Sequence, residues 1–160
     1  MAIDIFLKID GIDGESTDDK HKNEIAILSY AWGEEAQQAT AGGGGGAGKV
    51  AMQDFQFSMF VSNASPRLFL ACAKGEHFNT AVLTVRRAGA SPADFLKWRF
   101  TDVLISRYQT AGDGATGALP ADHASLKFSK IELEYSPVKP DGTLGTPVKA
   151  GWDNKTNKPV

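Results

Sequence analysis

Apolar and polar residues alternate along several stretches of the chain, and this period of two is that of a half-buried β-strand. The clearest alternation lies in residues 3–9 and 52–61, with the apolar positions Ile3, Ile5, Leu7, Ile9, Phe55, Phe57, Met59 and Val61. Similar patterns predict further strands over residues 24–34, 81–87, 95–108, 126–135 and 148–152. Many strands with turn-rich connections predict a mainly β protein, a compact β-barrel or sandwich of two antiparallel sheets.

One segment is typical of a short α-helix. Ser65 suits the N-cap, Pro66 suits the first helical position and Gly75 suits the end. The apolar residues that helical spacing brings to one face are Leu68, Phe69 and Cys72. We therefore expect one helix over residues 65–75.

Polar and glycine-rich segments predict the connections. Loops are expected over residues 11–23, 37–49 and 109–124, and a polar tail over residues 153–160. The second loop holds the run Gly42, Gly43, Gly44, Gly45 and Gly46. Such a run stays flexible, because its ordering costs entropy and no side chains pack in return. A change of alternation at Ser129–Lys130 predicts a β-bulge.

Composition narrows the class of protein. The 160 residues suit one domain spanning 1–160, and the net charge of −2 lacks the basic excess of a nucleic-acid-binding protein. No apolar run approaches the ~20 residues of a membrane span, so no membrane insertion is expected. Asp4 and Lys8 interrupt the apolar start, unlike a secretory signal peptide. Cys72 is the single cysteine, so no intrachain disulfide is possible.

The search for catalytic chemistry gives no constellation. His21, His77 and His123 stand in polar contexts without partners at metal-ligand spacing, which favours scattered surface positions over a zinc site. Gly48-Lys49 resembles the end of a phosphate loop, but Val50 replaces the required Ser or Thr and a strand follows instead of a helix. We therefore predict no enzyme, no cofactor and no metal.

Two other functions stay open at this stage. The aromatic residues could line the cleft of a small-ligand or glycan-binding β-sandwich, although aromatics at alternating strand positions more often form the core. These residues are Tyr30, Trp32, Trp98, Phe100, Tyr108, Tyr135 and Trp152. An enzyme with Cys72 as nucleophile is the other alternative, but this thiol lies on an apolar helix face with no basic neighbour.

Nearly the whole chain resembles the haemolysin-coregulated protein (Hcp) family, the tail-tube subunit of bacterial type VI secretion systems. The order and spacing of several segments carry the resemblance. They are MAIDIFLKIDGIDGES at 1–16, His21, EIAILSYAWG at 24–33, GGGGGAGKV at 42–50, QDFQFSMFVSNASPRLFLACAKGEHF at 53–78, LTVRRAG at 83–89, LKFSKIELEYSP at 126–137 and PVKAGWDNKTNK at 147–158.

The resemblance implies a structural and transport role. Six subunits would form a homo-hexameric ring, and rings would stack into a tube that works with spike and sheath proteins and carries small effector proteins in its lumen. The protein would assemble in the bacterial cytoplasm and then be secreted through the apparatus without a signal peptide.

Particular residues acquire expected roles from the same resemblance. Tyr30, Ala31 and Trp32 would face the lumen and its cargo, with Ala31 at a position where some relatives carry serine. The loop containing Asp18, Asp19, Lys20 and His21 would reach the adjoining subunit or ring. The glycine run Gly42–Gly46 would lie at a ring face.

Overall fold

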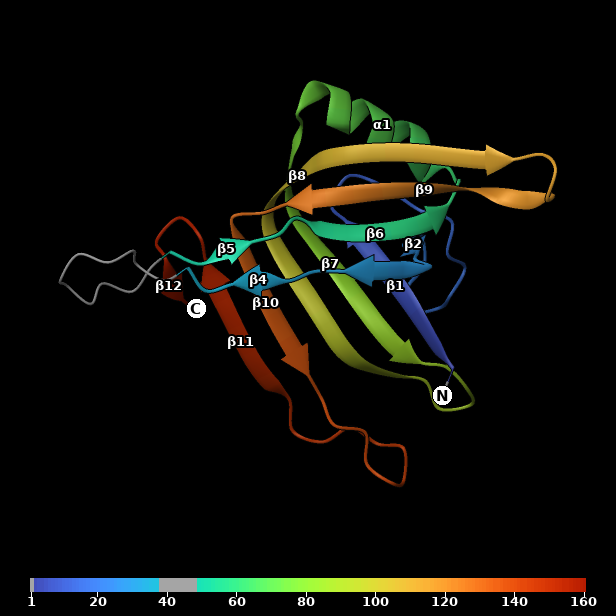
Figure 1. Cartoon of the computed structure of the whole chain (residues 1–160). Helices are drawn as coiled ribbons and strands as arrows, with labels where there is room; N and C mark the ends of the chain where they lie inside the picture. The colour runs from blue at the N-terminus through green and yellow to red at the C-terminus, as the bar shows by residue number, and fades with distance from the viewer. Residues whose placement is uncertain (1, 38–48) are drawn as a thin grey trace.

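The computed structural model describes residues 2–37 and 49–160 and shows twelve strands and one helix in this part of the chain (Figure 1). The predicted glycine run at 42–46 lies outside the described residues. The elements are β1 Ile3–Ile9, β2 Ile25–Ala26, β3 Ser29–Ala31, β4 Glu34–Glu35, β5 Ala51–Met52, β6 Phe55–Phe60, α1 Ala64–Lys74, β7 His77–Arg87, β8 Ala93–Asp113, β9 Ala118–Lys127, β10 Lys130–Tyr135, β11 Val148–Asp153 and β12 Lys158–Pro159.

Ten strands form one bent antiparallel sheet, and β4 and β5 form a second, two-stranded sheet. The main path runs β12-β11-β10-β8-β7-β1-β2, and β9, β6 and β3 continue from the other part of β8. The ladder does not close into a continuous barrel, because β2 ends on β1 and β3 ends on β6. Single backbone hydrogen bonds bridge this break, from Ile27 N to Ile5 O (2.9 Å) and from Leu28 N to Ser58 O (2.8 Å). The mainly β class is confirmed, whereas a closed barrel is not.

The core follows the predicted alternation. Leu7, Phe55 and Phe100 are fully buried, and Phe57 retains 3% of its exposure. Val61 lies past the end of β6 and is exposed, so the pattern held for Phe55, Phe57 and Met59 but not for the last position. The predicted strand over 24–34 is divided into β2, β3 and β4, because this segment changes its pairing partner from β1 to β6 and then to β5.

The helix α1 ends at Gly75 as predicted, with a left-handed φ of 64° that glycine adopts without strain. Its N-cap is Asn63, not Ser65. The hydroxyl of Ser65 instead donates to Oδ2 of the buried Asp122 at 2.6 Å, and the Tyr108 hydroxyl donates to the same oxygen at 3.0 Å. Burial, together with Asp122, raises the pKa of Tyr108. Of the residues expected on one apolar face, Leu68 is fully buried, whereas Phe69 is 60% exposed.

The predicted loop over 109–124 is a β-hairpin. The end of β8 and the start of β9 pair through this segment, with Thr110 opposite Asp122 and Asp113 opposite Ala118. Figure 1 shows the two strands running side by side to a common tip at one end of the molecule. The side chains of 109–113 and 118–120 are exposed on both faces, so the segment lacks the apolar alternation that reveals a strand in sequence.

Two further expectations need correction. Leu104 pairs with Lys127 and Thr101 pairs with Lys130, so no residue is inserted at Ser129–Lys130 and the predicted bulge is absent from this pair. Instead, Ser129 lies between the end of β9 and the start of β10, and Asp102 of β8 takes a φ of 56°. The predicted tail folds back as β12 on β11.

Candidate functional site

Two cross-strand rows of mostly polar residues run over the outward side of β3, β6, β9 and β8. The first row is Ser29, Ser58, His123 and Gln109, and the second is Ala31, Gln56, Ser125 and Arg107. The row between them, Tyr30, Phe57, Ala124 and Tyr108, points to the other side, because neighbouring residues of a strand face opposite ways. We call the two outward rows the polar face.

The polar face forms a shallow groove with a volume of about 220 Å³. The hydroxyls of Ser29 and Ser58 share a hydrogen bond of 2.5 Å across two of its strands. Arg107 and His123 are exposed, and no carboxylate is among the residues that line the groove. The groove therefore offers hydroxyls, amides and positive charge without an acidic group.

The three residues predicted to face a lumen lie on two sides of the chain. Ala31 belongs to the polar face and is exposed. The ring of Tyr30 stacks on Phe55 at 5.6 Å, and the ring of Trp32 packs against Trp98 at 5.5 Å. The indole Nε1 of Trp32 donates to the carbonyl of Gln53 at 2.9 Å. Only Ala31 of the three therefore contributes a side chain to the polar face.

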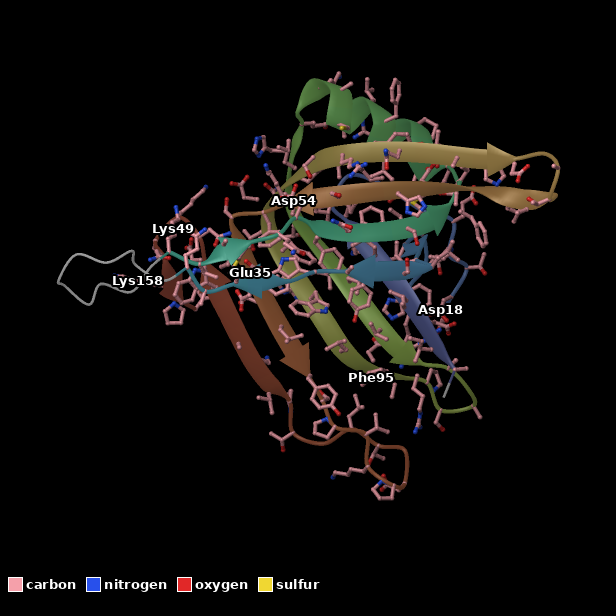
Figure 2. The ribbon with its side chains drawn as sticks, in the orientation of Figure 1. Asp18, Glu35, Lys49, Asp54, Phe95 and Lys158 are labelled. Carbon is pink, nitrogen blue, oxygen red and sulfur yellow. The ribbon has the colours of Figure 1, made fainter. Side chains whose placement is uncertain are left out.

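The predicted contact loop, residues 11–23, is held by hydrogen bonds from Arg86 of β7 to Asp18, the residue labelled on this loop in Figure 2. Both carboxylate oxygens of Asp18 accept hydrogen bonds from the Arg86 guanidinium, each at 2.7 Å. Asp18 also accepts the backbone N–H groups of Lys20 and His21 at 3.0 and 3.1 Å. The Arg86 pair, supported by these backbone donors, lowers the pKa of Asp18 to about 2.

His21 is buried, in contrast to the surface position expected from its polar context. Its Nδ1 lies 2.7 Å from Oε2 of Glu24, and its Nε2 lies 3.2 Å from both carboxylate oxygens of Asp94. The ring stacks on Phe6 with centroids 4.4 Å apart. These contacts bury the second side of β1, so Phe6 is covered within the chain. Asp19 and Lys20 are the exposed members of the predicted contact set.

The other candidates for chemistry remain separate. His77 is exposed and lies 3.1 Å from Asp102, while His123 belongs to the polar face. Cys72 is half-buried on α1. Within residues 2–37 and 49–160, no group of three histidine, cysteine, aspartate or glutamate side chains could hold a metal ion.

Sequence reasoning missed two features around these sites. Arg86 is a buried arginine near the end of a predicted strand, and the adjacent Arg87 made the pair look like an ordinary exposed charged end. The cross-strand rows of the polar face depend on register, which depends in turn on which strands become neighbours. The spacing of residues along a single strand reveals neither the burial of Arg86 nor the register between strands.

Comparison with known proteins gives the family. A family model described as "Type VI secretion system effector, Hcp" matches residues 6–135. Protein hcp1 of Pseudomonas aeruginosa is 39% identical over 160 residues, which cover 98% of each chain. The crystal structure of Hcp1 from Salmonella typhimurium is similar with a TM-score of 0.82 and 38% identity, over 100% of both chains. A structure described as a type six secretion system protein has a TM-score of 0.91 and 31% identity, over 99% of this chain and 100% of that one. The chain belongs to the Hcp family of type VI secretion proteins.

Proposed function

We propose that this protein is the tail-tube subunit of a type VI secretion apparatus. Six copies form a closed ring, and rings stack into a tube that is exported with a spike by a contracting sheath. The subunits assemble in the cytoplasm, and the secreted tube carries small effector proteins in its lumen. The proposal extends the family membership to a specific assembly.

The polar face is the observation that best supports this function. It spreads over four strands, six of its eight residues are exposed while Ser58 and Ser125 are buried, and no carboxylate is among the residues lining its groove. Such a surface suits weak, reversible contact with a protein that must later leave, because deep apolar burial would slow release. In the proposed ring this face lines the lumen, with Ala31 at its edge.

The remaining surfaces take the other expected roles. Asp19 and Lys20 are exposed at the top of the attached loop and contact the adjoining subunit or ring. Asp18 and His21 hold that loop in place.

The helix α1 has 11 residues, and no helix in the described part of the chain is long and apolar enough to span a bilayer.

Light scattering and negative-stain electron microscopy of the purified protein test the assembly. We expect a particle of about six times the 17.1 kDa chain mass, seen as rings with an open centre. A strictly monomeric species at high concentration would contradict the proposal.

Cargo carriage is tested separately by reversing the one permanent charge of the groove. In Arg107→Glu, we expect rings to form normally but an acidic effector to be lost during co-purification, because like charges repel across the polar face. Arg99→Glu is the matched control, since Arg99 is an exposed arginine of β8 outside this groove. Equal retention by both variants would remove the assigned role of the polar face.

A further inference from the structure

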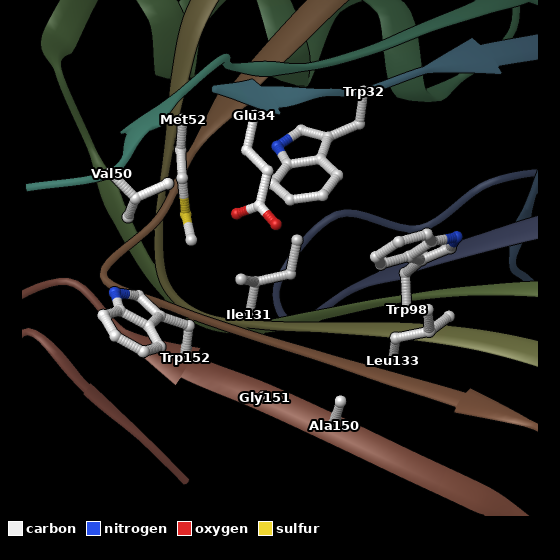
Figure 3. Close-up of a pocket in the computed structure, with 10 residues that line it drawn as sticks. All are labelled: Trp32, Glu34, Val50, Met52, Trp98, Ile131, Leu133, Ala150, Gly151 and Trp152. Atoms are coloured by element: carbon white, nitrogen blue, oxygen red, sulfur yellow. The ribbon is translucent and has the colours of Figure 1, made fainter. Parts of the chain in front are cut away.

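A second groove, lined mainly by apolar side chains, lies at the other end of the molecule from the β8–β9 hairpin. It is bordered by β4 and β5 on one side and by β8, β10 and β11 on the other, and its volume is about 330 Å³ (Figure 3). It shares no lining residue with the polar face. We call it the indole groove, because Trp32, Trp98 and Trp152 all line it.

The three indoles come from segments far apart in the sequence. Trp32 and Trp98 lie beside each other with ring centroids 5.5 Å apart and planes inclined by 56°. Trp152 lies across the groove from them on β11, as Figure 3 shows. All three are partly exposed and line the groove. Aromatic faces carry negative electrostatic potential and attract cations.

The groove also contains one acidic side chain. Glu34 on β4 extends its carboxylate into the space between Trp32, Met52 and Trp152 (Figure 3). No lysine, arginine or histidine of the described residues forms an ion pair with this carboxylate. The sequence of residues 1 and 38–48, which lie outside the described part of the chain, contains no lysine, arginine or histidine. A negative charge therefore stands among aromatic rings without a cationic side chain paired to it.

The remaining lining defines the chemistry of the ligand. Apart from Glu34 the lining side chains accept no strong hydrogen bonds, since Met52, Ile131 and Leu133 are apolar, so few hydroxyls of a sugar would find a partner. A primary ammonium group needs up to three acceptors, and the groove supplies a single carboxylate. A quaternary ammonium group has no N–H donor that needs an acceptor, and it gains from both the charge and the apolar walls. We propose that the indole groove binds a quaternary ammonium cation, with Glu34 as its counter-ion.

The experiment uses the full-length protein and two probes that differ only in charge. Choline and its neutral isostere 3,3-dimethylbutan-1-ol are titrated separately, and binding is followed by ligand-observed NMR and by tryptophan fluorescence. We expect saturable binding of choline and binding of the isostere weaker by about tenfold or more, as loss of the cation–π and ionic attraction predicts. Equal affinities, or no saturable binding of choline, would overturn the proposal.

Variants then assign the binding to this groove. Glu34→Gln should weaken choline binding by about tenfold, since the exposed side chain keeps its shape and loses its charge. Glu35→Gln is the matched control, because it removes the neighbouring charge of the same strand, and it should bind as the unaltered protein does. A thermal melt confirms that both variants are folded. The same affinity in Glu34→Gln and Glu35→Gln would contradict the role of Glu34. Because ring formation is measured separately by light scattering, this result is independent of the proposed tube function.

Discussion

The sheet has two outward surfaces, and their basic residues differ in burial and in ion pairing. Over β1 and β7 the loop 11–23 covers the sheet, so Thr84 and Arg86 are buried and Arg86 is ion-paired. Over β3, β6, β9 and β8 nothing in the described chain covers the sheet, so Arg107 and His123 are exposed and form no ion pair among the described residues. We call the first surface the covered face.

The difference separates residues that stabilise the chain from residues that are free to meet a partner. A buried charge with its partners lost is costly, whereas an exposed charge contributes little to folding. Polar residues of the covered face are therefore expected to affect the free energy of unfolding. Those of the polar face are expected to affect binding.

The largest effect is expected in the apolar layer beneath the polar face. Phe57 lies in sequence between the two polar rows, but its side chain points inward and only 3% of its surface is exposed. Phe57→Ala should lower the free energy of unfolding by about 3–5 kcal/mol through lost burial and a cavity. Denaturant unfolding measures this change. Gln56→Ala, one residue earlier on the polar face, should stay within about 0.5 kcal/mol. A similar effect of both variants would show that the two sides of β6 are not distinct.

The next effect compares two arginines. Arg86→Met keeps the apolar stem but leaves Asp18 without its bidentate partner, so we expect a loss of about 1–3 kcal/mol in the free energy of unfolding. Arg107→Met, the same change on the polar face, should alter it by less than about 0.5 kcal/mol. Equal losses in denaturant unfolding would abolish the distinction between the covered and polar faces.

Acid is expected to destabilise the protein by protonating ion-paired carboxylates such as Asp18 of the covered face. The pKa of Asp18 is lowered from 3.8 to about 2, mainly by its hydrogen bonds to Arg86. A depressed folded pKa means that the stabilisation is complete above the unfolded value and is lost as the pH falls from about 4 toward 2. The hydroxyl of Ser129, with Lys155 and His77, lowers the pKa of Asp102 to about 2 as well. Melting temperatures should fall in this window, and less steeply in Arg86→Met, which loses the main cause of the lowered Asp18 pKa and keeps the Asp102 contribution. An unchanged slope in that variant would contradict the assignment to Asp18.

The sequence predicted these regions unequally, for physical reasons. Strands β1 and β6 were predictable because each has a face in the core, which imposes alternation on residues such as Leu7 and Phe57. The outer part of the β8–β9 hairpin was not, because both its faces are exposed and backbone pairing alone maintains it. Burial of His21 was missed because it depends on Phe6, Glu24 and Asp94 meeting in three dimensions.

The inward direction of the Tyr30 and Trp32 side chains could be predicted only in part from the sequence. Alternation along β3 required that they oppose Ala31, but only the core contacts with Phe55 and Trp98 show which side faces outward. The family resemblance supplied the expected assembly, whereas the direction of these side chains came from the packing.

The smallest effect on folding is expected at Lys20, an exposed residue of the loop that covers β1 and β7. Lys20 is exposed and contributes its backbone N–H, not its side chain, to Asp18. Lys20→Glu should therefore leave the melting temperature unchanged while shortening the stacks of rings seen by electron microscopy, because it reverses a charge at the proposed contact. Asp18→Lys, two residues earlier, should instead lower the melting temperature, since it places two cations together at Arg86. Stacks of unaltered length in Lys20→Glu would exclude the loop from ring stacking, and an unaltered melting temperature in Asp18→Lys would show that the loop is not held by the Arg86 pair.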